Sequence, residues 1–166
     1  MEFKQFILKL SLQSRLCAVL FIAGILLKLT VSFSFSSAYS SNFFLPFVDY
    51  FISSGFSNPY LQFASRSVDI FPYPILMLVI LSIPKLLFGW INTSPELSTL
   101  IIKLPLLCAD IAIFYVLKSW LNHKHILKLI LLYWFSPVLI YISYIHGQLD
   151  AIPIALLFVS LYFLFH

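Results

Sequence analysis

Residues 136–165 read SPVLIYISYIHGQLDAIPIALLFVSLYFLF. In this stretch two apolar runs enclose five residues, His-Gly-Gln-Leu-Asp at 146–150. An imidazole, a carboxamide and a carboxylate are costly beside hydrocarbon, so such groups usually lie in a functional cavity or at the aqueous surface. The polar residues are therefore either part of a site or a short turn between two helices, and this stretch alone leaves both interpretations open.

The composition of the whole chain indicates a membrane protein. Of the 166 residues, 61% are hydrophobic and 10% are charged, and the mean hydropathy is +1.01. Soluble domains are about 45–50% apolar and about 25% charged. The lysines and arginines behind the net charge of +4 flank apolar runs, as topology signals do, and form no basic patch on a soluble scaffold. We therefore expect an integral, multi-pass membrane protein that binds no nucleic acid.

The apolar runs predict an all-α fold, a polytopic bundle of transmembrane helices. The first run is longer than the apolar core of a signal peptide, which favours a retained helix. Because the chain stops within an apolar run, we expect it to be the N-terminal fragment of a larger module. We expect one transmembrane domain over 1–166, with spans at about 16–35, 97–117, 129–145 and 151–166.

One further apolar run, 75–91, decides the topology. If it crosses the membrane, the basic loop 118–128 falls outside, against the positive-inside rule. If it lies along the interface or dips in and returns, which Pro84 and Lys85 permit, that loop is cytoplasmic. We therefore expect this run not to cross, the N-terminus to be cytoplasmic, and a long first extracytoplasmic loop to carry interfacial helices, the clearest at 42–52.

This topology gathers polar groups on the outer side. A carboxylate can take a proton from an acceptor hydroxyl as a general base, and a lysine near the interface can bind the phosphate of a lipid-linked donor. Together these roles suit the transfer of a group from a lipid phosphate to a hydroxyl, although surface acids and helix-end lysines also occur without such a site. The candidates are Asp49, Asp69, Lys103, His146, Gln148 and Asp150, with Lys28 approaching from the first span.

Asp110 is a separate case, because it lies inside the 97–117 run, seven residues after Lys103 and on nearly the same helix face. An intramembrane acid is a functional hypothesis by default, and a structural pairing with Lys28 or Lys103 is the alternative. The sequence has no metal-ligand spacing, phosphate-binding glycine loop, nucleophile elbow or cysteine motif. We therefore expect no cofactor and no divalent metal.

Several motifs follow one another along the chain: Phe71-Pro72-Tyr73-Pro74 opening an apolar run, Lys103-Leu104-Pro105 with Ala109-Asp110, a basic loop, Ser136-Pro137, and the group at 146–150. This order resembles the N-terminal part of the GT-C superfamily of membrane glycosyltransferases. Within it, the chain is most similar to polyprenyl-phosphate-sugar-dependent enzymes, including dolichyl-phosphate-mannose mannosyltransferases and their bacterial relatives.

The resemblance implies an outer active site formed by the first loop and a second, shorter loop. It implies three partners: membrane lipid, a polyprenyl-phosphate sugar as donor, and a hydroxyl acceptor. Mannose is one candidate for the sugar. Asp150 would match the acid of the second loop, Asp69 the acid before the proline-rich opening, and Lys103 the basic residue before Leu-Pro. We expect a bacterial cytoplasmic membrane rather than the endoplasmic reticulum.

The chain departs from the family just after the first span. The family usually carries a catalytic acid there, where this chain reads Tyr39-Ser40-Ser41-Asn42. Asn42 can bind a substrate hydroxyl but cannot act as a base, and Asp49 lies about two helical turns further on. Either Asp49 has taken the role, so that Asp49, His146 and Asp150 are catalytic, or the role is lost.

Loss of the acid would leave a different function. The alternative to a glycosyltransferase is a non-catalytic relative that binds a lipid phosphate or scaffolds a partner. A third hypothesis, a small transporter, uses Lys28 and Asp110 as an intramembrane pair. We rank the transporter last, since the long outer loop has no obvious use in it.

Overall fold

The computed structural model describes residues 2–35, 37–64, 71–90, 94–121 and 125–165, and side chains from residue 13 onward. Within these ranges every regular element is a helix, as the hydropathy predicts. Three helical segments there are long and apolar enough to cross a membrane: Gln13–Ser34, Pro95–Trp120 and Ile126–His146. The elements are α1 (Glu2–Ser34), η1 (Ser40–Phe44), α2 (Leu45–Ser53), α3 (Pro59–Gln62), α4 (Ile75–Phe88), α5 (Pro95–Trp120), α6 (Ile126–Leu129), η3 (Ile130–Trp134), α7 (Pro137–Leu139), η4 (Ile140–His146) and α8 (Ala151–Phe165).

Three of these helices begin at the same two-residue signal, a polar cap followed by proline: Asn58-Pro59, Ser94-Pro95 and Ser136-Pro137. In each pair the polar side chain accepts a hydrogen bond from a backbone N–H of the first turn. Proline suits the next position because its missing N–H would be unpaired there anyway. The third pair interrupts the last long segment, so that α7 and η4 continue from a fresh start.

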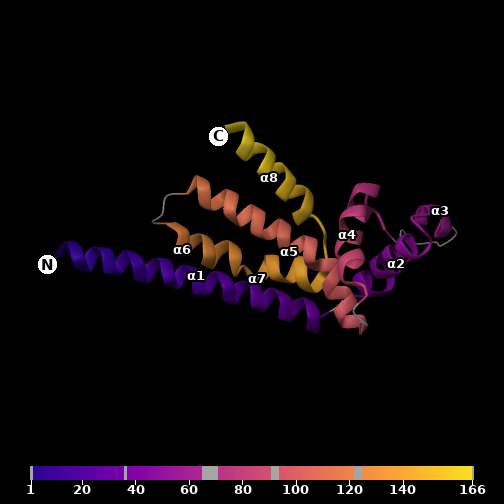
Figure 1. Ribbon diagram of the computed structural model, residues 1–166, viewed down its shortest axis with the longest axis horizontal. Helices are drawn as coiled ribbons and strands as arrows, with labels where there is room; N and C mark the ends of the chain where they lie inside the picture. The colour runs from indigo at the N-terminus through magenta and orange to yellow at the C-terminus, as the bar shows by residue number, and fades with distance from the viewer. Residues whose placement is uncertain (1, 36, 65–70, 91–93, 122–124, 166) are drawn as a thin grey trace.

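The helices α1 and α5 pack antiparallel, with the segment 126–146 beside them and α8 returning along α5 (Figure 1). Residue numbers along α1 rise as their partners along α5 fall: Phe21 contacts Phe114, Lys28 contacts Asp110, and the carbonyl of Phe35 contacts Lys103. The end of α1 and the start of α5 therefore lie at the same end of the bundle. We call this the loop end; the opposite one, where α5 ends after Lys118 and α6 carries Lys128, is the basic end.

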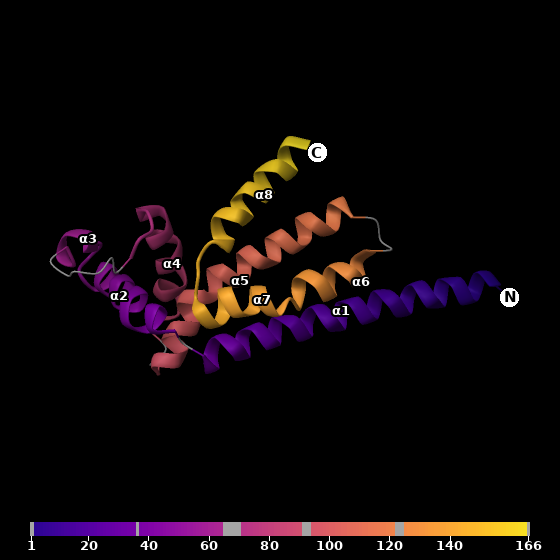
Figure 2. The ribbon, with the colours of Figure 1, turned by 180° about the vertical axis from the view of Figure 1, so that it is seen from behind.

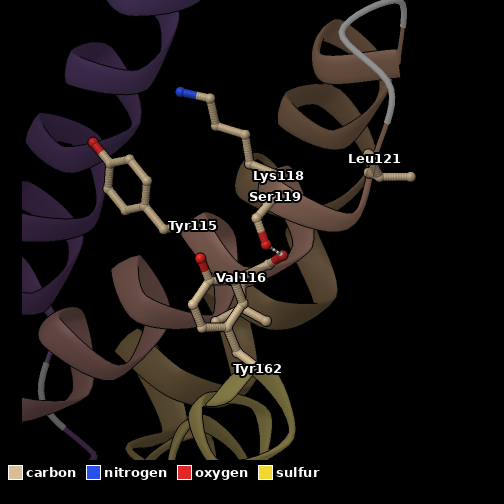
Figure 3. Close-up of a pocket in the computed structure, with 6 residues that line it drawn as sticks. All are labelled: Tyr115, Val116, Lys118, Ser119, Leu121 and Tyr162. Carbon is tan, nitrogen blue, oxygen red and sulfur yellow. Dashed lines mark hydrogen bonds between the residues drawn. The ribbon is translucent and has the colours of Figure 1, made fainter. Parts of the chain in front are cut away.

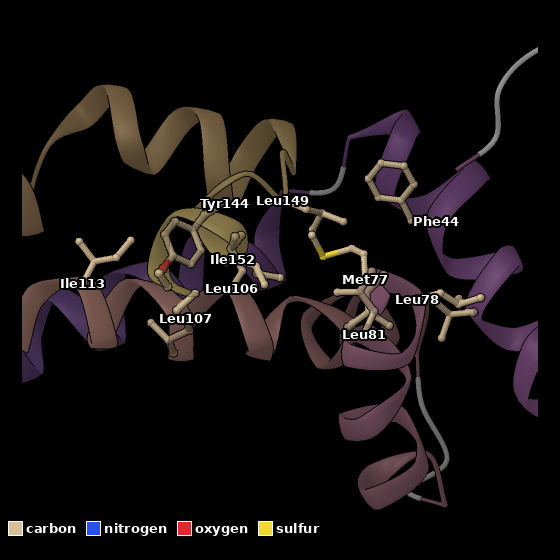
Figure 4. Packing of buried hydrophobic residues seen from close by; sticks show 14 of the residues in the cluster. Phe44, Met77, Leu78, Leu81, Leu106, Leu107, Ile113, Tyr144, Leu149 and Ile152 are labelled. Atoms are coloured by element: carbon tan, nitrogen blue, oxygen red, sulfur yellow. The ribbon is translucent and has the colours of Figure 1, made fainter. Parts of the chain in front are cut away.

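The helix α4 runs across the loop end rather than alongside the long helices (Figures 1 and 2). Its 14 residues extend about 21 Å, which is less than the roughly 30 Å of a hydrocarbon core. One face, with Met77, Leu78 and Leu81, is buried against Phe44 and Leu149 (Figure 4). Because α1 ends and α5 begins at the same end of the bundle, α4 has the geometry expected of a run that does not cross the membrane. The placement of α4 relative to a membrane stays a prediction.

The other predicted segments lie where expected, with adjusted bounds. The predicted helix at 42–52 is part of a continuous helical stretch formed by η1 and α2. The last predicted span corresponds to α8, whose 15 residues make it shorter than the three long segments.

Gly24 sets the spacing between α1 and the segment 126–146. A Cβ atom at this position would lie 2.1 Å from Nε1 of Trp134. That indole nitrogen donates a hydrogen bond to the carbonyl of Phe21 at 3.0 Å, and the Phe21 and Trp134 rings stack at 4.6 Å. The absence of a side chain at Gly24 therefore allows Trp134 to reach the backbone of α1.

Candidate functional site

A cluster of buried polar groups lies in the centre of the bundle. Lys28 Nζ is 2.6 Å from Asp110 Oδ2 and 3.2 Å from the centre of the Trp134 ring. The hydroxyls of Tyr133 and Tyr144 donate hydrogen bonds to the Asp110 carboxylate. We call these five residues the buried charge cluster. Of the two interpretations of Asp110, the geometry gives the pairing with Lys28, and the predicted contact of Lys28 with a donor phosphate would require this ion pair to open.

Lys103 of α5 connects the end of α1 and η4 at the loop end of the bundle. Its side chain is 3% exposed, and its ammonium donates hydrogen bonds to the carbonyls of Phe35 at 3.2 Å and Tyr144 at 2.8 Å. Tyr144 therefore connects two buried lysines, since its hydroxyl contacts Asp110 while its carbonyl accepts from Lys103. The helix that carries the 146–150 turn is thus fixed to both α1 and α5.

The turn itself, residues 146–150, is held by its backbone. Gly147 has φ +85° and ends η4 in the left-handed region, which glycine adopts without strain. The N–H groups of Gly147 and Gln148 both donate to the carbonyl of Ile142. Leu149 is buried against α4, whereas Gln148 and Asp150 are exposed. The turn therefore anchors one apolar side chain and leaves its amide and its carboxylate accessible.

The first loop meets this turn at a cavity of about 230 Å³, here called the turn cavity. The rings of Tyr39 and His146 lie edge to face at 5.8 Å across it. Burial raises the pKa of Tyr73, and the charge of Asp150 acts in the same direction. Tyr73 is therefore a neutral phenol that can donate or accept a hydrogen bond. The lining residues are Tyr39, Phe44, Pro72, Tyr73, His146, Gly147 and Gln148.

A second cavity of about 310 Å³, here called the bundle cavity, lies between α5, the 126–146 segment and α8. Its polar lining comes from Asp110, Tyr133, Ser143, Gln148 and Asp150. Gln148 lines both cavities. The 146–150 turn therefore lies between the turn cavity, which the first loop also lines, and the bundle cavity, which extends to the buried charge cluster.

Lys28 and Lys103 are therefore engaged inside the bundle, and the other predicted site residues that the structure describes fall into two groups. His146, Gln148 and Asp150 lie together at the cavities. Asp49, on α2, pairs with Lys85 of α4 at 3.2 Å and is half-exposed. Asn42 is exposed on η1, and neither Asn42 nor Asp49 is among the residues that line the two cavities. Asp69 lies outside the described residues.

Four tyrosines of the site were not predicted from the sequence. Tyr39 and Tyr73 line the turn cavity, while Tyr133 and Tyr144 belong to the buried charge cluster. Tyr73 is part of the Phe-Pro-Tyr-Pro motif, which marked it as a helix start but not as a site residue. The other three carry no local signal, because their partners lie on distant helices.

Comparisons of the chain with profiles of protein families, with curated protein sequences and with solved structures find no match. The resemblance to GT-C glycosyltransferases therefore depends on the order of the motifs quoted above. Among the described residues no group of three or more histidine, cysteine or acidic side chains is placed to hold a metal ion. The expectation of no cofactor stays a prediction.

Replacing Gly147 by alanine is expected to destabilise the loop end by about 2–4 kcal/mol, from left-handed backbone strain and overpacking together. The added Cβ would lie 2.3 Å from Ser40 Oγ. Thermal unfolding in detergent measures the loss. Gly55→Ala is the matched control, since Gly55 has φ +70° and open space around it. Equal losses in the two variants would contradict the close packing of the turn on Ser40, and Ser40→Ala should partly rescue Gly147→Ala.

Proposed function

We propose that the chain is a membrane glycosyltransferase of the GT-C type, or the N-terminal part of one. It transfers a sugar from a polyprenyl-phosphate donor to a hydroxyl acceptor at the loop end. The turn cavity is the observation that carries this proposal, because there aromatic side chains of the first loop meet His146 and Gln148, next to Asp150. Rings that stack on a sugar, together with polar groups that bind its hydroxyls, suit a carbohydrate site.

Asp150 is the general base in this proposal, because it is exposed and lines the bundle cavity. Its carboxylate takes the proton of the acceptor hydroxyl while that oxygen bonds to the anomeric carbon of the sugar. The bond from that carbon to the phosphate oxygen breaks, and its electron pair leaves with the polyprenyl phosphate. Gln148 and His146 bind sugar hydroxyls, and Tyr73 contributes a neutral phenol.

The membrane placement belongs to the same proposal. The N-terminus and the basic end face the cytoplasm, as the positive-inside rule favours. The loop end faces outward with α4 lying at the interface, which gives its exposed leucines a lipid environment. We propose a bacterial cytoplasmic membrane as the location. The donor would then reach the turn cavity from the outer leaflet.

A second candidate is a non-catalytic protein that binds a lipid phosphate or scaffolds a partner. Two observations favour it. Asn42 occupies the first-loop position where the resemblance leads us to expect an acid, and the carboxylate of Asp49 is engaged by Lys85 outside the cavities described. Such a protein would keep the turn cavity as a binding site without transferring the sugar.

Membranes from cells that express the chain, with any following part of its reading frame, test the two proposals. They are given polyprenyl-phosphate mannose labelled in the sugar, and membranes without the chain are the control. A glycosyltransferase moves the label to an acceptor that is stable to the mild acid that cleaves the donor. Retention of the donor by the purified chain without transfer would favour the binding protein. Neither retention nor transfer of several such donors would overturn both.

A further inference from the structure

The basic end of the bundle contains a cavity that the proposed sugar transfer does not use. It has a volume of about 520 Å³ and lies beside the last turns of α5 and α8. Three polar side chains, from Tyr115, Lys118 and Tyr162, project there beside Ser119, whose hydroxyl donates to the carbonyl of Val116 (Figure 3). Lys103 at the loop end is 15 residues from Lys118 on the same helix, about 22 Å along its axis. This cavity is therefore separate from the proposed donor site.

An apolar groove adjoins this cavity. It has a volume of about 230 Å³ and shares Tyr115 and Lys118 with the first cavity. Figure 3 shows both side chains extending toward α1. We call the two spaces together the double cavity. Apart from the shared pair, the groove is lined by Cys17, Ala18, Phe21, Ile22, Phe114, Ile126 and Ile130.

Charge at the double cavity is positive. Lys118 is exposed, with its ammonium 5.4 Å from the ring of Tyr115. Arg15 and Lys128 are exposed at the same end. The ion pairs found among the described residues involve Lys28 and Lys85 instead. Of the acids whose side chains the structure describes, Asp110 is buried in the bundle, while Asp49, Glu96 and Asp150 lie at the loop end. The ammonium of Lys118 is thus available to an anion that enters the cavity.

We infer that the double cavity binds an anionic phospholipid, with its phosphate at Lys118 and one acyl chain in the apolar groove. A cation beside hydroxyl groups suits a phosphodiester headgroup. A groove with an apolar lining suits a hydrocarbon chain better than a free phosphate, and its position between apolar helices opens it toward lipid. Tyrosine and lysine together are typical of the headgroup level of a bilayer.

Phosphatidylglycerol carrying a spin label on its acyl chain tests the inference, with phosphatidylcholine as the neutral probe. The full chain is reconstituted into phosphatidylcholine vesicles, and the motionally restricted fraction of each probe is measured. We expect preferential restriction of phosphatidylglycerol. Lys118→Gln should weaken its relative affinity about five-fold, the loss of one direct, partly exposed ion pair with the phosphate. Lys128→Gln, the matched control outside the lining, should change it by less than about two-fold.

Blocking the groove separates the acyl contact from the charge. Ala18→Phe retains Lys118 but fills the apolar groove, so we expect it to reduce the restricted fraction of phosphatidylglycerol as well. Equal effects of Lys118→Gln and Lys128→Gln would overturn the inference, since they indicate diffuse attraction of anionic lipid. So would full displacement of the probe by inorganic phosphate, or equal restriction of both probes. Circular dichroism of each variant checks that the helices remain folded.

Discussion

Asp110→Asn is expected to lower the free energy of unfolding by about 3–5 kcal/mol, because it leaves the ammonium of Lys28 buried without its counter-charge. Lys28 is 1% exposed and its ammonium lies 2.6 Å from the carboxylate. Asparagine keeps the size of the side chain, so the loss reports charge rather than packing. Unfolding of the purified protein in detergent, followed by circular dichroism, measures it.

Two further variants define the origin of that loss. The double variant Lys28→Met with Asp110→Leu removes both charges and should recover much of the stability, since an apolar pair can replace a buried ion pair at little cost. Tyr133→Phe removes one hydrogen bond to the charged carboxylate and should cost less than loss of the ion pair, about 1.5–3 kcal/mol. Wild-type stability of Asp110→Asn would contradict the account of the buried charge cluster, as would a double variant no more stable than the single one.

Asp150→Asn is expected to reduce sugar transfer by about 10²- to 10⁴-fold, the usual contribution of a general base. Because Asp150 is exposed, the fold should be unaffected, and donor retention should remain near that of the wild type. Initial rates of transfer from labelled polyprenyl-phosphate mannose measure the change.

Asp49→Asn is the matched control for this loss. Its carboxylate pairs with Lys85 on a half-exposed surface, so the substitution should leave the transfer rate within a few-fold and cost at most about 1 kcal/mol of stability. A large loss with Asp49→Asn and none with Asp150→Asn would assign the base to the first loop instead. Full rates in both variants would remove carboxylate catalysis by either residue.

Local signals account for much of the fold. Length and hydropathy predicted helices throughout, and three segments long enough to span are present. A serine followed by proline marks the start of α5 at Ser94-Pro95 and the break in the 126–146 segment at Ser136-Pro137. For Asp110 the sequence narrowed the choice, because an acid inside an apolar run needs a partner and few cations were available. Lys28 proved to be that partner.

Contacts between distant segments account for what the sequence left open. Asp49 and Lys85 are 36 positions apart, and nothing local indicates that α2 and α4 pair them. The tyrosines around Asp110 were indistinguishable from the lipid-facing aromatic residues that abound in this chain. The turn cavity likewise arises from the return of the first loop to the end of η4. Such sites depend on helix packing, which hydropathy does not specify.

Cysteine labelling from outside the cell tests most directly whether the first loop and the 146–150 turn share one side of the membrane. The background chain carries Cys17→Ser and Cys108→Ala. Single cysteines are then placed at three exposed positions, Ser57, Gln148 and Leu121. We predict that a membrane-impermeant maleimide labels the first two in intact cells and labels Leu121→Cys only after permeabilisation. Labelling of Ser57→Cys and Gln148→Cys from opposite sides would contradict the shared site.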